Sequence, residues 1–186
     1  MARRDDRRTE GDRGPVVLVT GCSSGIGRAL VGAFAEAGCR VVATARRVET
    51  IEGLAGDRVL VHPLDITDPE QRGAAVEAAT EWAHHPDVLV NNAGWGLIGP
   101  ASELDLGDVR RQLETNVVAT LAMTQTVVPG MAARESGRIV TIGSVSAVTT
   151  TPFSGAYCAS KAAVYSLCDA LRMELGRFGI AVVEVQ

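Results

Sequence analysis

Several features that define other classes of protein are missing from this 186-residue sequence. No apolar run reaches the roughly 18 residues that a membrane-spanning helix needs. The arginine-rich N-terminus is not followed by an apolar segment that could act as a secretion signal. The net charge of −4 is not that of a dedicated nucleic-acid binder. We therefore expect a cytoplasmic protein with neither a membrane nor a nucleic acid as its partner.

The sequence also lacks a cysteine pattern that would point to a metal site or a disulfide framework. Its four cysteines, Cys22, Cys39, Cys158 and Cys168, do not have the spacing of metal ligands. They are typical of reduced thiols in a cytoplasmic protein, and we predict no metal site.

No internal repeat, linker or shift of composition marks a second domain. Hydrophobic residues make up 46% of the chain, so we expect a packed core. A chain of this length forms one domain that buries about 70% of its unfolded surface. Residues 1–15 differ, because they carry five arginines and four acids and almost no apolar side chain. We predict a disordered, charged tail there; its charges nearly cancel, which disfavours a nucleic-acid arm.

The stretch from Val16 to Gly27 combines a short apolar run, a glycine-rich turn and the start of a helical pattern. In this order, Gly21 would let the chain turn, Gly25 would let the backbone approach a pyrophosphate, and Gly27 would let the helix pack closely. Phosphates would meet the unpaired N–H groups at the start of the helix. The spacing is G-x-x-x-G-x-G, which differs from the commonest dinucleotide fingerprint, so an ordinary glycine-rich turn is the alternative.

Two arginines, Arg46 and Arg47, follow the second predicted strand, and no acid occurs before Glu49. In a doubly wound sheet, the end of this strand lies near the adenosine ribose. A carboxylate there would bind the 2′-hydroxyl, whereas an arginine would pair with a 2′-phosphate. The pattern favours NADP(H) over NAD(H); a solvated basic turn is the alternative.

Predicted strands and helices alternate along the chain. This order indicates an α/β fold: a doubly wound parallel sheet of six strands in a Rossmann-type, three-layer α/β/α arrangement with right-handed crossovers. We expect the second long helical region to break near its end at Pro129-Gly130. The predicted strands are 16–19, 40–45, 59–61, 87–90, 138–142 and 180–185, and the predicted helices are 25–37, 69–83, 105–134 and 156–178.

Tyr157 and Lys161 are four residues apart in the last predicted helix, so they share one face. A neighbouring ammonium lowers the pKa of a phenol, which would let tyrosine exchange a proton with a carbonyl oxygen. A nearby serine hydroxyl could hold the same oxygen. A serine acting as an acyl nucleophile is disfavoured, because no histidine is placed to serve as its base. A core tyrosine beside a solvated lysine is the alternative for the pair.

The combination of motifs, in this order and spacing, resembles the short-chain dehydrogenase/reductase family over about residues 16–186. The motifs that carry the resemblance are Thr20-Gly21-Cys22-Ser23-Ser24-Gly25-Ile26-Gly27, Asn91-Asn92-Ala93-Gly94, Asn116, Ser144 and Tyr157-Cys158-Ala159-Ser160-Lys161.

This resemblance implies an NAD(P)(H)-dependent oxidoreductase that transfers hydride between its cofactor and an alcohol or carbonyl compound. Arg46 matches a basic residue of NADP-preferring members, so we expect NADP(H) to be preferred, with NAD(H) possible. Tyr157 would be the acid/base, Lys161 would bind the nicotinamide ribose, and Ser144 would orient the substrate oxygen. Asn116 would hold a water in a proton relay, while Asn91 would support the sheet and the cofactor. Asp65 would contact adenine. The residues implied to bind the cofactor are Gly21, Ser23, Ser24, Gly25, Ile26, Gly27, Arg46, Asp65, Asn92, Ala93, Gly94, Tyr157 and Lys161.

The resemblance also implies a homodimer or homotetramer that assembles through the long helices. Members of the family continue beyond the sixth strand, so we expect residues 16–186 to be an NAD(P)-binding domain truncated at its C-terminus. The alternative function is therefore a catalytically silent nucleotide-binding fragment or scaffold.

Overall fold

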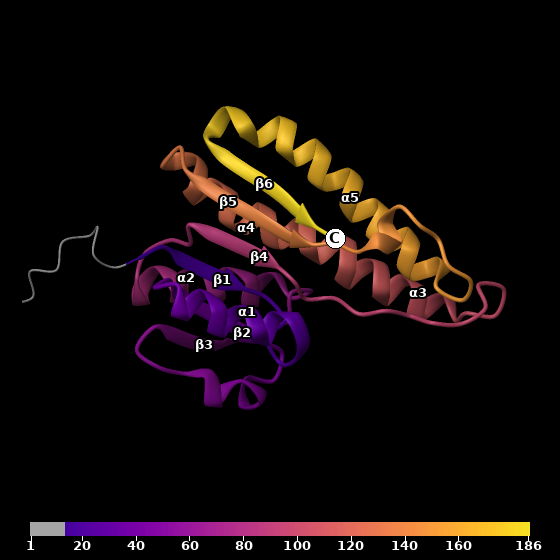
Figure 1. Ribbon diagram of the computed structural model, residues 1–186, viewed down its shortest axis with the longest axis horizontal. Helices are drawn as coiled ribbons and strands as arrows, with labels where there is room; N and C mark the ends of the chain where they lie inside the picture. The colour runs from indigo at the N-terminus through magenta and orange to yellow at the C-terminus, as the bar shows by residue number, and fades with distance from the viewer. Residues whose placement is uncertain (1–13) are drawn as a thin grey trace, which may run out of the picture.

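The computed structural model describes residues 14–186, and the predicted tail falls almost wholly on residues that lie outside this range. The described chain is a parallel six-stranded sheet with helices on both faces (Figure 1). The strand order is β3-β2-β1-β4-β5-β6. Successive strands are added toward one edge of the sheet from β1 to β3 and toward the other edge from β4 to β6, so the order of addition reverses between β1 and β4. The predicted fold class is confirmed.

The six strands lie close to their predicted positions. Both neighbours of β1 pair with it in parallel: Val17 faces Val41 on one side and Val88 on the other. The β-branched residues of β1 are fully buried, as expected for a central strand covered on both faces. The strands are β1 (Val16–Val19), β2 (Arg40–Ala45), β3 (Val59–Pro63), β4 (Val88–Asn91), β5 (Gly137–Ile142) and β6 (Ile180–Val185).

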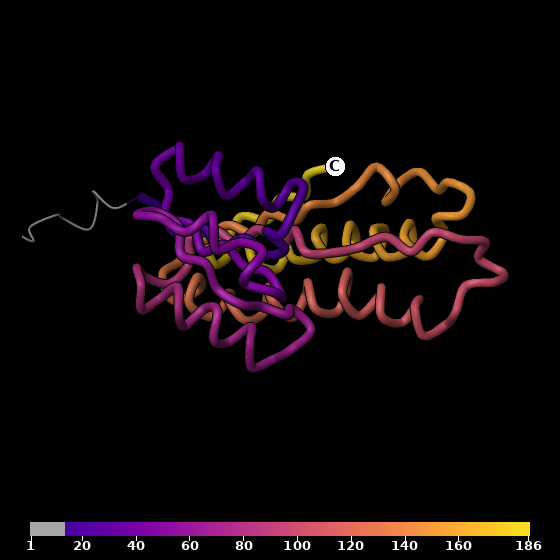
Figure 2. The backbone as a smooth tube through the Cα atoms, turned by 90° about the horizontal axis from the view of Figure 1, so that it is seen from below, coloured from indigo at the N-terminus to yellow at the C-terminus, as the bar shows by residue number. Residues whose placement is uncertain are grey.

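Alternate side chains of β1 enter two separate cores. Val16 and Leu18 join one core with α2 (Pro69–Trp82), α4 (Thr120–Ala133) and α5 (Gly155–Leu175). Val17 and Val19 join the other, whose helical cover is α1 (Gly25–Glu36) and the 3₁₀ turns Val48–Thr50 and Glu52–Leu54. Figure 2 shows α1 on the opposite side of the sheet from α2 and α4. The two faces are therefore covered unequally within the described residues.

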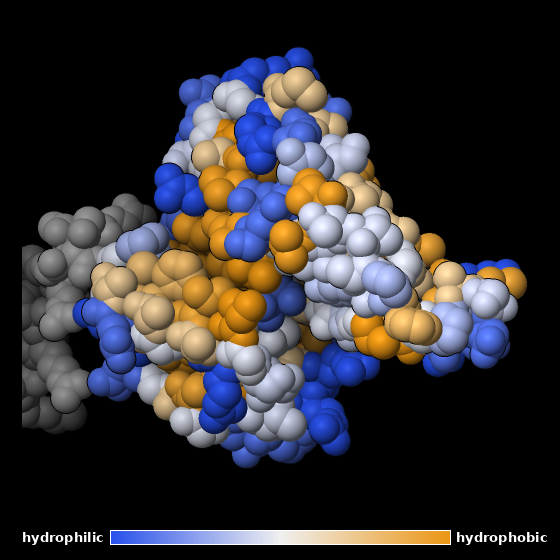
Figure 3. All heavy atoms as spheres, turned by 45° about the vertical axis from the view of Figure 1, so that its right-hand side comes forward, coloured by the Kyte–Doolittle hydropathy of each residue, from blue (hydrophilic) through white to orange (hydrophobic). Residues whose placement is uncertain are grey.

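The lightly covered face leaves apolar side chains in contact with solvent. On the edge strand β6, Val183 and Val185 are exposed. Figure 3 shows hydrophobic side chains gathered in a band across one view of the surface. Within residues 14–186, no helix is both long and apolar enough to cross a membrane.

One prediction about the helices was wrong. Pro129 does not break the helical region, because α4 continues past it to Ala133. Proline removes the helical bond to the Gln125 carbonyl, but Gln125 and Pro129 are both exposed, so this bond is lost on the solvent-facing side of the helix. The interruption occurs earlier, where a π-helical stretch, Glu114–Ala119, separates α3 (Leu106–Leu113) from α4.

Candidate active site

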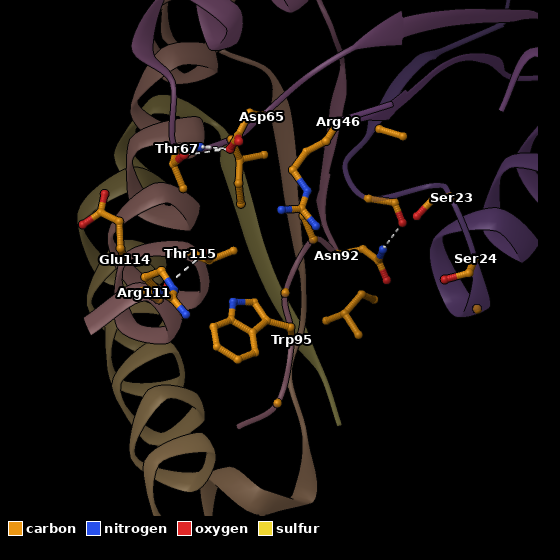
Figure 4. A pocket seen from close by; sticks show the side chains of 18 of the residues that line it. Ser23, Ser24, Arg46, Asp65, Thr67, Asn92, Trp95, Arg111, Glu114 and Thr115 are labelled. Atoms are coloured by element: carbon orange, nitrogen blue, oxygen red, sulfur yellow. Dashed lines mark hydrogen bonds between the residues drawn. The ribbon is translucent and has the colours of Figure 1, made fainter. Parts of the chain in front are cut away.

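A large pocket opens at the carboxyl ends of the strands, where ligands bind in doubly wound sheets. Its volume is about 1110 Å³. Figure 4 shows its polar side chains converging from the glycine turn, the ends of β2, β3 and β4, and the α3 side. Twelve of the fifteen predicted site residues line it: Gly21, Ser23, Ser24, Gly25, Ile26, Arg46, Asp65, Asn92, Ala93, Gly94, Tyr157 and Lys161.

The three glycines of the first turn have the conformations and contacts that their predicted roles need. Gly21 has a φ of 72°, and a Cβ on it would lie 2.8 Å from the Ala93 Cα. A Cβ on the buried Gly27 would lie 2.4 Å from both the Gly21 oxygen and the Asn92 Nδ2. Gly25 has a φ of 55° and open space where its side chain would be. Close packing therefore excludes a side chain at Gly21 and Gly27. At Gly25 the positive φ favours glycine, and the absence of a side chain leaves open space.

Side chains at the end of β1 and β4 hold this turn in place. The Thr20 hydroxyl donates to the Val90 carbonyl at 3.3 Å and accepts the Asn92 and Ala93 N–H groups at 3.0 Å each. The Asn92 amide donates to the carbonyls of Thr20 and Gly21, at 2.9 and 3.0 Å. These bonds join residues about 70 positions apart and fix one pocket wall against the other.

The N-terminus of α1 differs from those of α2 and α3. Asp68 caps α2 by accepting two backbone N–H groups, and Asp105 caps α3 in the same way with one. Among the described side chains none caps α1, whose first turn carries no acid. Its first N–H groups and the positive end of its dipole are therefore available at the pocket, beside Ser24 and Ile26. This arrangement suits an anionic group such as a pyrophosphate.

Arg46 and Asp65 lie on the part of the pocket formed by β2 and β3. Arg46 is exposed and points into the pocket in Figure 4, whereas its neighbour Arg47 does not line it. Asp65 Oδ1 accepts the Thr67 N–H at 3.0 Å and the Thr67 hydroxyl at 2.7 Å. Its carboxylate is thus oriented by Thr67, and the other oxygen remains available.

Tyr157 and Lys161 lie on the first turns of α5, at the other end of the pocket. Lys161 Nζ is 5.9 Å from the centre of the Tyr157 ring and donates to the Ile142 carbonyl at 2.7 Å. Burial lowers the pKa of Lys161, and the charge of Glu184 on β6 opposes this shift. Gly96 lies beside the tyrosine ring: a Cβ built on it would be 3.5 Å from Tyr157 Cδ2, an ordinary contact distance.

Asn116 does not line the pocket; it is a buried residue of the π-helical stretch. Its amide donates to the Trp95 carbonyl at 2.9 Å and to the Ser160 hydroxyl at 3.1 Å, and it accepts the Trp95 N–H at 3.1 Å. Both N–H groups of the amide are therefore used within the protein. This geometry ties the loop after β4 to α5, and the predicted role in holding a water stays a prediction.

Ser144 and Gly27 also lie outside the pocket lining. Gly143, the residue before Ser144, does line the pocket. The Ser144 hydroxyl oxygen accepts the Ser146 N–H at 3.1 Å and caps a 3₁₀ turn, Val145–Ala147. Its role in orienting substrate stays a prediction. Asn91 is buried, and its amide donates to the Thr124 hydroxyl at 3.0 Å, which joins the sheet to α4.

Sequence reasoning missed several residues that line the pocket. Trp95 follows the Asn-Asn-Ala-Gly motif directly, so its position next to that motif was an available signal. Four lining residues on α3 and the π-helical stretch come one to six positions before Asn116, but nothing in their pattern marks them. The missed lining residues are Ala45, Leu64, Ile66, Thr67, Trp95, Gly96, Ile98, Arg110, Arg111, Glu114, Thr115, Ile142 and Gly143.

The strand order, the glycine turn and the pocket at the reversal point define a nucleotide-binding fold of the Rossmann class. Residues 15–186 match the family described as short chain dehydrogenase. Since this match covers nearly the whole sequence, the chain belongs to the short-chain dehydrogenase family.

Two relatives illustrate the similarity in sequence. The chain is 36% identical to a Dehydrogenase/reductase SDR family protein 7-like of Anopheles gambiae over 190 residues, which covers 96% of this chain and 60% of that protein. It is 41% identical to human 17-beta-hydroxysteroid dehydrogenase type 1 over 177 residues, which covers 89% of this chain and 53% of the human protein. The chain thus spans little more than half the length of these relatives.

Two solved structures illustrate the similarity in fold. A gluconate 5-dehydrogenase from Burkholderia cenocepacia J2315, in complex with NADP and tartrate, has a TM-score of 0.86 and 30% identity, covering 93% of this chain and 72% of that one. A 3-ketoacyl-(acyl-carrier-protein) reductase from Brucella melitensis, complexed with NADH, has a TM-score of 0.89 and 32% identity, covering 92% and 74%.

Proposed function

We propose that this protein is an NADP(H)-dependent oxidoreductase that interconverts an alcohol and a carbonyl compound. The observation that carries the proposal is a single pocket that joins an anion-binding turn to a tyrosine–lysine pair. The uncapped start of α1 lies on one part of its wall, and Tyr157 and Lys161 lie on another. Both parts are needed for a redox reaction that uses a nicotinamide dinucleotide.

The residues of the pocket fit such a cofactor. The space at Gly25 and the N–H groups of α1 would accommodate the pyrophosphate. Asp65, oriented by Thr67, would accept a bond from the adenine amino group, and Arg46 would pair with a 2′-phosphate. Lys161 would donate to the ribose next to the nicotinamide. The bound cofactor would supply or accept the hydride.

Tyr157 would then exchange a proton with the substrate oxygen. The pocket that contains Tyr157 also has apolar lining residues, among them Ile98, Ile142 and Trp95. The substrate class that fits this wall is a small to medium apolar alcohol or carbonyl. The resemblance assigns Ser144 to the same oxygen, and its free hydroxyl hydrogen is compatible with that role, because its oxygen accepts a backbone N–H.

The proposal is tested by replacing the acid/base while the fold is kept. For Tyr157→Phe we expect NADPH-dependent turnover of a carbonyl panel to fall by about 10²- to 10⁴-fold, the usual contribution of a general acid or base. Thermal unfolding should change little, since the ring remains.

Tyr165→Phe is the matched control, because Tyr165 lies two turns further along α5 and does not line the pocket. Equal turnover of the wild type and the Tyr157 variant would contradict the proposal. It would instead support the alternative of a catalytically silent nucleotide-binding scaffold.

We also propose a cytoplasmic homo-oligomer assembled through α4 and α5. A second cavity of about 400 Å³ lies between these helices, and Leu121, Val128, Leu167 and Leu171 supply much of its apolar lining. The four cysteines are free and buried, which suits a reducing compartment. Light scattering after gel filtration would measure the assembly, and a monomer at micromolar concentration would contradict it.

A further inference from the structure

Gln112 on α3 is a polar side chain that the proposed function does not use, although it is completely buried. Its Nε2 donates to the Trp95 carbonyl at 3.1 Å. Its Oε1 is buried and has no hydrogen-bond partner among the described residues. A buried acceptor without a partner lowers stability, and a methionine would fill similar space without that penalty. Packing alone therefore does not account for a glutamine at this position, whereas its bond to the Trp95 carbonyl does.

That group is the peptide of Trp95, which side chains hold on both sides. The Trp95 carbonyl accepts two donors, Gln112 Nε2 at 3.1 Å and Asn116 Nδ2 at 2.9 Å. The Trp95 N–H donates to Asn116 Oδ1 at 3.1 Å. Gln112 and Asn116 are four residues apart, so they present their amides from one side of the helical segment. Every backbone polar atom of Trp95 is therefore bound by a buried side-chain amide.

The indole of Trp95 stands in the pocket, with 38% of the residue exposed. Figure 4 shows it between Arg111 and Thr115 on one side and Asn92 on the other. The next residue, Gly96, packs against the Tyr157 ring. The loop that carries the indole thus has its backbone held by two amides and runs beside the Tyr157 ring.

We propose that Trp95 is a specificity-determining wall of the substrate pocket and that Gln112 is the residue that positions it. This inference rests on the proposed function, because it assumes a carbonyl substrate beside Tyr157. A flat aromatic side chain on an anchored backbone favours a substrate with a flat ring next to the carbonyl, through offset or edge-to-face contact. It disfavours a branched aliphatic group of similar size, which cannot pack as closely on the ring. The favoured class is therefore aryl ketones and the corresponding benzylic alcohols.

The positioning role is tested without turnover. The sequence has two tryptophans, so Trp82→Phe leaves Trp95 as the single tryptophan, which is excited selectively at the red edge of its absorption band. In this background we expect Gln112→Met to keep or raise the melting temperature, because the unpaired acceptor is removed. It should lower the fluorescence anisotropy of Trp95 and increase its quenching by acrylamide. Gln125→Met, the same change at an exposed site on α4 outside the active-site pocket, should alter neither signal.

The specificity role is tested with acetophenone and pinacolone as probes. We expect Trp95→Leu to lower the ratio of kcat/KM for acetophenone over pinacolone by about 2- to 10-fold, the contribution of one aromatic contact. Gln112→Met should lower it in the same direction by less, and Trp95→Phe should largely keep it. A lower melting temperature for Gln112→Met with unchanged anisotropy and an unchanged ratio would show a merely structural glutamine and overturn the proposal. If the wild type reduces neither ketone and no other carbonyl, the proposed function fails, and the fluorescence result still decides whether Gln112 positions Trp95.

Discussion

The two walls of the pocket are built on different physical principles. The wall formed by β1, its turn and α1 depends on missing side chains: Gly21 and Gly27 leave no room for a Cβ. The wall formed by the loop after β4 depends on side chains that are present and buried, the amides of Gln112 and Asn116. The first wall depends on close packing of the turn against residues about 70 positions away, and the second on side-chain bonds between residues 17 to 21 positions apart. A ligand between the two walls would meet backbone N–H groups on one side and the Trp95 side chain, which can be replaced by mutation, on the other.

The largest effect is expected from adding a methyl group to the glycine wall. In Gly27→Ala the new Cβ would overlap the Gly21 carbonyl, which is backbone and cannot move without distorting the turn. We expect the change to destabilise the protein by about 1–3 kcal/mol and to lower NADPH affinity by about 100-fold. Urea denaturation and fluorescence titration would measure the two quantities.

Gly32→Ala is the matched control on the same helix. Gly32 is exposed, and a Cβ there would meet no atom within 4 Å, so alanine should stabilise α1 by about 0.5–1 kcal/mol. Equal changes of stability and NADPH affinity in Gly27→Ala and Gly32→Ala would show that close packing at Gly27 does not shape the pocket wall.

A smaller effect is expected from the charge at the end of β2. Arg46→Asp should weaken NADPH binding by about 10- to 100-fold, because a charge-assisted contact to the 2′-phosphate is lost and a repulsion is introduced. NADH binding should be unchanged or stronger, since the aspartate can accept the 2′-hydroxyl. Isothermal titration with both cofactors would measure the change, with Arg47→Asp as the control outside the pocket. Equal losses for the two cofactors would show that Arg46 does not contact the 2′-phosphate.

The smallest effect that we expect is a pH dependence of stability caused by Lys161, which lines the pocket from α5. Burial lowers its pKa below the ordinary 10.5, so the unfolded chain holds the proton more tightly than the folded one. Between the lowered pKa and 10.5 the unfolded state binds more protons, and the free energy of unfolding therefore rises with pH. Relative to Lys161→Met, we expect the wild type to gain stability as pH increases through this window. Urea denaturation at a series of alkaline pH values would show it, and parallel curves would contradict the shift.

The sequence predicted the elements that depend on local patterns, but not those that depend on contacts between distant residues. Strands, the glycine turn and the start of α2 at Asp68 follow from local patterns, and the structure agrees with them. The π-helical stretch and the continuation of α4 through Pro129 depend on tertiary contacts and on solvent access. A pattern of residues does not report either of these. The burial of Asn116 is of the same kind, because its partners Trp95 and Ser160 come from distant elements.

The site divides in the same way. Motif residues such as Ser24 and Tyr157, which the family resemblance assigns to the site, do line the pocket. Gln112 has no such motif beside it, and its contact with the Trp95 carbonyl exists only after folding. Ser144 shows the reverse case, since a recognisable motif residue lies next to the lining instead of in it.

The central place of β1 in the sheet has a consequence for how the molecule assembles as it is synthesised. β1 can pair with β2 after a short loop closure, because Val17 and Val41 are close in sequence. Its other neighbour includes Val88, so this pairing must wait until β4 has left the ribosome. During that interval one edge of the most apolar strand is uncovered. We therefore expect the nascent chain to be most prone to aggregation between the synthesis of β2 and that of β4.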